Sequence, residues 1–404
     1  MQKLRSLLIL FVVIAVSLPL TISAQDEAPQ IGFWEECETP TLTGDINLGV
    51  VFSLTGGAAI YGNPQLQAVQ MAVEEINDSD YLGEANLVAI VEDGGTDVET
   101  SISAMTKLVE EDQVPVVIGP TLSNQALSAD PIAQDAGVLV LGVSNTRSNL
   151  ETDIGDFYLR NSLPEAKVIP GTVAQATEIL GLENVAVMYS DNDEFTVSGY
   201  EVFVEALEAN GVNIVATETF ATGDTDFNAQ LTNIIALNPD AIVVSALAAE
   251  IVPLLQQTRN LGYTGPIIGG NGFNTPGIAS PDTGAGESAN GVIVGGAWNI
   301  AKQNELSLAF SEKYEAEYGA APDQFSVQAY TGAWMIATGI RCADSTESAA
   351  VRDALKGLKD FNSPLGSFSF DDDGLPEHEP VAQIIVDGQY RVLTSEEAAA
   401  VFGE

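Results

Sequence analysis

The stretch Ile46–Gly62, INLGVVFSLTGGAAIYG, decides the fold. Its first half, Ile46–Leu54, is mostly apolar and typical of a buried parallel strand, and a glycine-rich loop follows it. A helix is expected to start near Asn63 and Pro64, with Asn63 as its N-cap. Small ligands bind an open parallel α/β sheet at the loops that follow the carboxyl ends of its strands. Tyr61, at the tip of such a loop, is therefore predicted to close over a ligand.

The same alternation of short strands and helices continues along the chain. Further strands are predicted at 86–91, 114–119, 138–143, 185–189, 213–219, 241–245, 266–268, 291–295, 366–370, 381–386 and 389–393. Helices are predicted at 98–112, 165–180, 196–210, 227–237, 250–261, 305–318 and 326–340. This alternation predicts an α/β protein with doubly wound parallel sheets.

The composition excludes several classes of partner and site. The chain of 404 residues has 57 acidic and 14 basic residues, and its formal net charge is -43. Nucleic acid and anionic membranes are poor partners for such a chain, and we interpret the acidity as an effect of solubility and environment. With one histidine, His378, and two cysteines, no zinc site or histidine-based triad is expected. No metal or cofactor is predicted, and the acidic run 371–374 is read as a solvated turn because it lacks the spacing of a calcium loop.

The N-terminus has the pattern of an export signal. Residues 1–24 are predicted to be a signal peptide, with Lys3 and Arg5 before the apolar run 7–20 and a small residue at the cleavage point. No cysteine follows closely enough for a lipid anchor. Residues 25–44 are polar and acidic and are predicted to form a loose arm. The mature protein is expected to be exported, periplasmic or extracytoplasmic, soluble and monomeric.

Several short motifs occur in the order and spacing of one known family. They are S-L-T-G-x-x-A-x-Y-G at 53–62, V-I-G-P-T-L-S at 117–123, L-G-V-S-N-T at 141–146, the glycine-bounded strand at 291–295, and F-D-x-x-G at 370–374. With them, the chain resembles the leucine/isoleucine/valine-binding protein family, the extracytoplasmic solute receptors of ABC importers, over about residues 44–393. The resemblance implies a type I periplasmic binding fold, in which two lobes are joined by three hinge strands. Lobe 1 would comprise 45–160 and 297–366, and lobe 2 would comprise 161–296 and 367–404.

The resemblance assigns lobe 1 residues to the ligand's polar end. Ser123 follows a strand and begins a helix, where a hydroxyl and free N–H groups suit a carboxylate, and the matching serine of the family binds one. Thr146 matches the family's carboxylate-binding threonine, and Ser144 matches a position whose backbone carbonyl takes the ligand ammonium. Asn145, between them, is included in the predicted site. The alternative is that Ser123 only caps its helix and that the other three residues only form a turn.

Lobe 2 is expected to cover the ligand with apolar side chains. Phe195 matches an aromatic residue that covers the ligand in relatives. Leu247 follows the strand 241–245, where relatives often carry tyrosine and where a smaller residue leaves more room. Phe325 of lobe 1 could line the same pocket, although core packing explains both phenylalanines equally well.

Asn271 departs from the family pattern. Many amino-acid-binding relatives place an acid near this position to pair with the ligand ammonium, whereas an amide brings no charge. Asp191, Asp193 or Glu250 could replace that acid. A carboxylate or amide ligand without an ammonium group is the alternative.

Cys37 and Cys342 are predicted to form a disulfide in an exported protein. On the family fold, the arm with Cys37 enters the first strand at the end of lobe 1 far from the cleft. The helix that starts near Phe325 runs away from the cleft, so Cys342 should reach the same end. Two unpaired cysteines are the alternative.

These features together predict a substrate-binding protein of an ABC importer, not an enzyme. A small solute, with a branched-chain or related amino acid as the best guess, would bind lobe 1 before lobe 2 closes on it, and a membrane permease complex would be the partner. One alternative is a sensor of the same fold for an amide or carboxylate, acting on a separate receptor. A hydrolase is disfavoured because the chain has no G-x-S-x-G elbow, no P-loop and no set of general bases.

Overall fold

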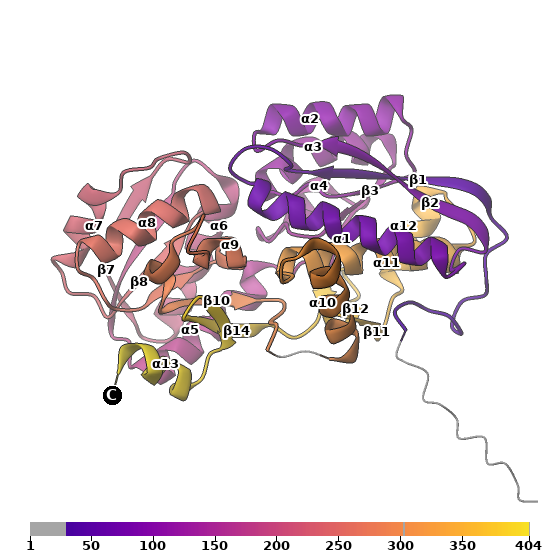
Figure 1. The fold of residues 1–404 in the computed structure, drawn as a ribbon. Coiled ribbons are helices and arrows are strands. Elements are labelled where there is room, and N and C mark those ends of the chain that lie inside the picture. The colour runs from indigo at the N-terminus through magenta and orange to yellow at the C-terminus, as the bar shows by residue number, and fades with distance from the viewer. Residues whose placement is uncertain (1–29, 302–303, 404) are drawn as a thin grey trace, which may run out of the picture.

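A computed structural model describes residues 30–301 and 304–403, so the predicted signal peptide lies outside the described residues. The chain forms two α/β lobes that lie side by side (Figure 1). Lobe 1 is built on a parallel sheet with the strand order β2-β1-β3-β4-β5. These strands are β1 (Thr43–Phe52), β2 (Glu84–Asp93), β3 (Val116–Ile118), β4 (Leu139–Gly142) and β5 (Tyr158–Arg160).

Helices cover both faces of the lobe 1 sheet. They are α1 (Ala59–Asp78), α2 (Val98–Thr106), α3 (Ser123–Ala136), α4 (Leu150–Ile154), α10 (Glu305–Tyr318), α11 (Gln324–Ala343) and α12 (Ser348–Lys356), and a π-helical turn, Lys107–Glu111, extends α2. Val50 and Phe52 of β1 pack towards α1 and α11, whereas Val51 packs towards α2 and α3. All three side chains are fully buried, and each burial contributes roughly 1.5–3 kcal/mol. The apolar run Ile46–Leu54 predicted a buried strand of this kind, with both of its faces covered.

Lobe 2 is built on a seven-stranded sheet with the order β15-β14-β10-β9-β8-β6-β7. Its strands are β6 (Asn184–Ser190), β7 (Asn213–Phe220), β8 (Ala241–Ser245), β9 (Ile267–Gly269), β10 (Val292–Gly296), β14 (Val381–Val386) and β15 (Gln389–Val392). Its helices are α5 (Glu165–Leu180), α6 (Glu194–Ala209), α7 (Asn228–Ile235), α8 (Ala248–Asn260), α9 (Pro276–Ala279) and α13 (Ser395–Phe402), with short 3-10 turns at Asn271–Phe273 and Gly286–Ala289. The predicted α/β fold with two doubly wound lobes is confirmed, although β14 and β15 add an antiparallel hairpin to this sheet.

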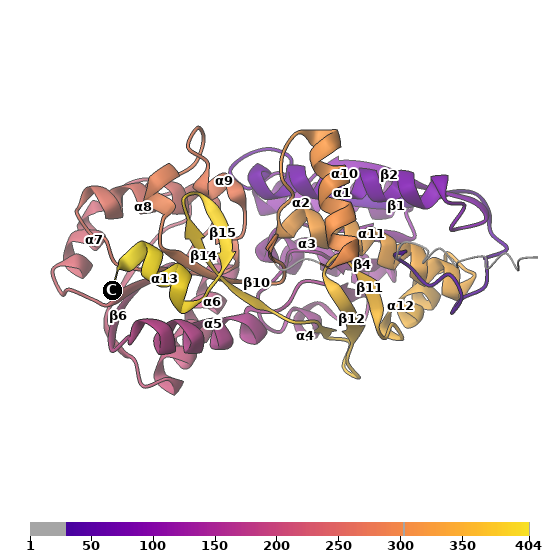
Figure 2. The same ribbon diagram turned by 60° about the horizontal axis from the view of Figure 1, so that its bottom comes forward.

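The chain crosses between the lobes three times. The crossings follow β5, β10 and β13, and Figure 2 shows how the last of them leads from the β12 region to β14. A small sheet of β11 (Phe361–Ser363), β12 (Gly366–Phe370) and β13 (Pro376–Glu377) precedes that last crossing. Phe368 and Phe370 of β12 lie in the same apolar core cluster as β1 and α11. We therefore propose a lobe boundary after residue 377 in place of the boundary predicted between residues 366 and 367.

Helix α1 begins earlier than predicted. The expected N-cap, Asn63, lies inside the helix, which starts at Ala59, and Pro64 follows within it. The N–H groups of Tyr61 and Gly62 already donate to the carbonyl oxygen of Ala58, at 3.0 and 3.2 Å. A Cβ atom at Gly62 would lie 2.0 Å from the carbonyl oxygen of Ser53, so glycine allows this turn to pack against the end of β1.

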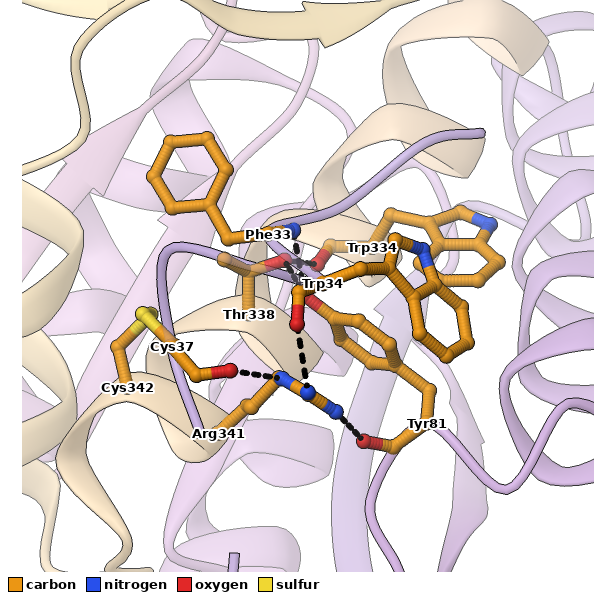
Figure 3. The surroundings of a disulfide bond; sticks show 8 residues. All are labelled: Phe33, Trp34, Cys37, Tyr81, Trp334, Thr338, Arg341 and Cys342. Atoms are coloured by element: carbon orange, nitrogen blue, oxygen red, sulfur yellow. Dashed lines mark hydrogen bonds between the residues drawn. A yellow bond between two sulfur atoms is a disulfide. The ribbon is translucent and has the colours of Figure 1, made fainter. Parts of the chain in front are cut away.

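The prediction of a loose N-terminal arm is wrong for its described part, from residue 30 onwards. The arm packs on lobe 1, where Phe33 N donates to the hydroxyl of Tyr81 and Ile31 is buried. Arg341 of α11 donates to the carbonyl oxygens of Trp34, Cys37 and Tyr81, and its guanidinium lies over the Trp34 and Tyr81 rings (Figure 3). Aromatic side chains in the arm bury enough surface to overcome its polar composition.

The predicted disulfide between Cys37 and Cys342 is confirmed, with a Cα–Cα distance of 5.0 Å (Figure 3). It joins the arm to the end of α11 and closes a loop with a sequence separation of 305 residues. A cross-link over so long a loop removes much conformational freedom from the unfolded chain.

We expect the double substitution Cys37→Ser and Cys342→Ser to lower the free energy of unfolding by about 2–5 kcal/mol. Urea unfolding followed by circular dichroism measures this loss. Wild-type protein unfolded with a thiol reductant is the control, because it should show the midpoint of the variant. A wild-type midpoint that does not respond to reductant would contradict the stabilising role of the bond.

Candidate functional site

The carboxyl ends of the two sheets face a common cavity. In lobe 1 the strand order reverses between β1 and β3, and in lobe 2 it reverses between β6 and β8. Loops diverge at such switch points and leave a crevice for ligands. A cavity of about 20 Å³ lies between them, lined by Tyr61, Thr121, Leu122, Ser123, Asn124, Ser144, Asp193, Phe195, Leu247, Asn271, Gly272 and Phe325. The structure therefore brings together six of the eight predicted ligand residues: Tyr61, Ser123, Ser144, Phe195, Leu247 and Asn271.

One end of the cavity is polar and lies at the start of α3. Ser123 is the first residue of this helix and is 3% exposed, and its Oγ accepts a hydrogen bond from Arg147 N at 3.3 Å. The hydroxyl proton of Ser123 is thus available to a ligand. The first N–H groups of a helix have no partner within it and favour a negative charge. This end of the cavity can bind a carboxylate.

A buried network fixes the loops behind Ser123. Thr121 Oγ1 donates to Gln65 Oε1 at 2.7 Å and accepts from Ser53 N at 3.0 Å. Gln65 Nε2 donates to Ser144 Oγ, which donates in turn to the Thr121 carbonyl oxygen at 2.6 Å. The loops after β1, β3 and β4 are therefore held in one arrangement. Sequence reasoning missed Thr121 as a lining residue, although it lies in the quoted motif at 117–123.

Tyr61 joins the two lobes across the cavity. Its hydroxyl donates to the carbonyl oxygen of Gly272 in lobe 2 at 2.8 Å, and its ring packs on Phe325 with ring centroids 4.7 Å apart. Burial raises the pKa of the Tyr61 hydroxyl well above its usual value, so this group stays a donor. Tyr61 lies in the first turn of α1, not in the predicted loop.

Lobe 2 supplies an acid and two apolar side chains. Asp193 caps α6, and its Oδ1 accepts from the N–H groups of Phe195 and Thr196 at 3.1 and 3.0 Å. Burial raises the pKa of the Asp193 carboxyl above its usual value. Phe195 and Leu247 form the apolar wall beside it. Phe325 of lobe 1 also lines the cavity, so apolar side chains and the polar groups at the start of α3 share it.

Asn271 lines this cavity and also a second one of about 10 Å³. Its amide Oδ1 accepts from Gln324 Nε2 of lobe 1 at 2.7 Å, and its backbone N–H donates to Glu165 Oε1 at 2.8 Å. Thr146, Glu165, Gln324 and Gln328 line the second cavity. Glu165 was read from the sequence only as the start of a helix, because no local pattern shows that its side chain turns towards the lobe interface.

The remaining predicted residues take different places. Thr146 lines the second cavity, and its Oγ1 is buried without a hydrogen-bond partner among the described residues. Asn145 lines neither cavity; its Nδ2 donates to the carbonyl oxygen of Pro120 at 3.0 Å beneath the site. Three acids were proposed to replace the acid that relatives carry near position 271. Of these, Asp193 lines the main cavity. Asp191 is exposed, and Glu250 Oε1 accepts from Gly223 N instead.

The lobes are in contact in this structure. Besides the Tyr61 and Gln324 hydrogen bonds, Ser148 N of lobe 1 donates to Ser198 Oγ of lobe 2 at 3.2 Å. A cavity of about 20 Å³ has room for little more than a water molecule. A larger solute therefore needs the lobes or the lining side chains to move apart.

Comparison with known proteins identifies the class to which this fold and site belong. The sequence profile of the periplasmic binding protein family matches residues 45–388, and the chain belongs to this family, which consists of solute-binding proteins rather than enzymes. The Leu/Ile/Val-binding protein BraC3 of Rhizobium johnstonii is 27% identical over 337 residues, covering 83% of this chain and 90% of that protein. None of the helices in the described part of the chain is long and apolar enough to span a membrane.

Two solved structures have the same fold. The branched-chain amino acid transporter substrate-binding protein LivJ of Streptococcus pneumoniae, in complex with isoleucine, is 26% identical with a TM-score of 0.81, covering 86% of this chain and 98% of that one. An ABC transporter solute-binding protein of R. palustris, in complex with benzoate, is 19% identical with a TM-score of 0.78, covering 87% and 96%. At this identity the second likeness concerns the fold alone.

We expect Tyr61→Phe to favour separation of the lobes, because it removes the hydroxyl that donates to Gly272 but keeps the ring on Phe325. The loss should be about 0.5–1.5 kcal/mol, the usual net contribution of one hydrogen bond. Small-angle X-ray scattering of the protein without solute should show a larger radius of gyration than for the wild type.

Tyr263→Phe is the matched control, since the Tyr263 hydroxyl bonds within lobe 2, to the Pro266 carbonyl oxygen. This variant should scatter as the wild type does. Equal radii of gyration for all three proteins would show that the Tyr61 bond does not hold the lobes together.

Proposed function

We propose that this protein is an exported substrate-binding protein of an ABC importer that captures a branched-chain or closely related amino acid between its lobes. The observation that carries the proposal is the start of α3. There the Ser123 hydroxyl and the first N–H groups of the helix lie at a cavity that residues of both lobes line, among them Phe195 and Leu247 of lobe 2. Such an end recognises a carboxylate.

The side chains that line the cavity support an aliphatic amino acid as the ligand. Tyr61, Phe195, Leu247 and Phe325 all line it, so a ligand with one anionic end and an apolar body fits its chemistry. The names of the relatives agree, since BraC3 is a Leu/Ile/Val-binding protein and the LivJ structure holds isoleucine.

Capture by closure explains the two-lobed design. The solute binds the polar end in lobe 1, and lobe 2 then covers it with Phe195 and Leu247. Closure is favoured only if the solute binds the closed form more tightly than the open one. The closed protein is then what a membrane permease recognises, and the predicted signal peptide would place the receptor outside the cytoplasm.

We expect titration calorimetry to detect leucine, isoleucine or valine binding to mature protein that was unfolded, stripped of solute and refolded. Ser123→Ala should weaken this binding by roughly 10- to 100-fold, because a hydrogen bond to a charged group is lost. Ser128→Ala is the matched control. Its hydroxyl lies on the same helix but donates to the Asn124 carbonyl oxygen, so affinity should not change.

The same titration should include benzoate, 4-methylpentanoate and short amides. Binding of ammonium-free carboxylates alone, weakened by Ser123→Ala, would overturn the amino-acid ligand but not the capture role. Amino-acid binding of wild-type strength in Ser123→Ala would contradict the carboxylate site at α3.

A further inference from the structure

The second cavity contains buried polar atoms that the fold itself does not use. Thr146, Glu165 and Gln328 are 3%, 1% and 0% exposed. Thr146 Oγ1, Glu165 Oε2 and both amide atoms of Gln328 have no hydrogen-bond partner among the described residues. Buried polar groups nearly always have a hydrogen-bond partner in folded proteins, so we expect these atoms to bind a group from outside the described residues. These residues come from both lobes and meet beside Asn271, which also lines the main cavity.

Two glycines leave space for the Glu165 carboxyl group, and one backbone hydrogen bond holds it there. Its Oε1 accepts from Asn271 N at 2.8 Å and lies 2.5 Å from where a Cβ atom of Gly270 would be. Its Oε2 lies 2.6 Å from where a Cβ atom of Gly199 would be, and the unpartnered hydroxyl of Ser245 lies 2.5 Å from the same point. Any side chain at position 199 or 270 would collide with this carboxyl group. The fold thus makes room for an acid behind the binding cavity.

The other acids near the lobe interface already have partners in the protein. Asp193 Oδ1 accepts two N–H groups at the start of α6, and Asp323 Oδ1 accepts Ser326 N at the start of α11. Glu165 uses one oxygen on Asn271 and leaves the other without a donor. Among the described residues that line the two cavities, none is lysine or arginine. When Glu165 is ionised, a positive charge beside it therefore comes from the solute and not from the lining of the cavities.

We infer that Glu165, with the hydroxyl of Thr146 beside it, binds the ammonium group of the captured amino acid and supplies the negative charge that Asn271 lacks. This inference rests on the proposed capture of an amino acid, and it names the group that selects amino acids over plain carboxylates. The carboxylate of the solute stays at Ser123, and its ammonium group points towards the second cavity. Binding requires some opening at Asn271, which lines both cavities.

Ionisation of Glu165 is coupled to this binding. Burial raises the pKa of the Glu165 carboxyl to about 8, and the nearby carboxylate of Asp193 adds to the effect. The other groups that face Glu165 are neutral: Asn271 and Ser245 of lobe 2, and Thr146 and Gln328 of lobe 1. An ammonium group lowers the pKa again, so Glu165 gives its proton to the solvent when the solute binds. The affinity for amino acids should therefore rise with pH until Glu165 is ionised in the free protein.

Leucine and 4-methylpentanoate test the inference because they differ only in the ammonium group. Calorimetry at pH 7 in buffers of different ionisation enthalpy measures the protons released on binding. For the wild type we expect roughly 0.9 proton per leucine, since a carboxyl with a pKa of about 8 is mostly protonated at pH 7, and none for 4-methylpentanoate. This measurement needs no variant.

Glu165→Gln should abolish the proton release and weaken leucine binding at least tenfold, while 4-methylpentanoate binds no more weakly than before. Glu250→Gln is the matched control. It removes another buried glutamate of lobe 2, bonded to Gly223 N and lining neither cavity, so leucine binding and proton release should be unchanged.

Leucine binding of wild-type strength and unchanged proton release in Glu165→Gln would overturn the inference and leave amino-acid capture intact. If Glu165→Gln weakened leucine binding but a proton were still released, the proton would be assigned to Asp193. This result would also overturn the inference. A wild type that binds 4-methylpentanoate but no amino acid would overturn both the inference and the proposed amino-acid ligand.

Discussion

The geometry of parallel sheets is the constraint on which the site depends. All strands of such a sheet end at the same edge, so the loops after β1, β3 and β4 gather at one place in lobe 1. Lobe 2 repeats this arrangement with the loops after β6, β8 and β9. Because the chain crosses between the lobes three times, the two edges face each other and share one cavity. The start of α3 in lobe 1 and the side chains of Phe195 and Leu247 in lobe 2 thereby line the same cavity.

Polar contacts between the lobes include an ion pair between Arg147 and Glu194 at 3.5 Å and several hydrogen bonds. Tyr61 with Gly272, Gln324 with Asn271, and Ser148 with Ser198 are hydrogen bonds, each with a net contribution of roughly 1 kcal/mol. When the lobes separate, these groups form hydrogen bonds with water instead. In the proposed capture by closure, a solute shifts the balance between open and closed forms only by its own differential affinity for the closed form.

Three arginines of this acidic chain hold loops in place by donating hydrogen bonds to backbone carbonyl oxygens. Arg341 binds three of them and anchors the N-terminal arm far from the cleft. Arg259 binds the carbonyl oxygens of Tyr263, Gly265, Ser288 and Asn290 and fixes the loops around β9. Arg160, fully buried and paired with Glu151, holds the 145–147 turn. The planar guanidinium, with its five donors, suits this task better than an ammonium group does.

The sequence by itself determined the α/β class, most strands, two helices to the residue (165–180 and 305–318), the disulfide and six of the twelve residues that line the main cavity. These depend on local periodicity, or on motifs that lie where strands end. Only the tertiary structure decided that the acidic arm is packed, that Asn145 supports the site from below, and that Glu165 reaches the lobe interface. Each of these depends on a contact with a residue distant along the chain: Arg341 for the arm, Pro120 for Asn145, and Asn271 and Gly199 for Glu165. No local pattern encodes such contacts, because the free energy of burial is set by what the fold brings against a side chain.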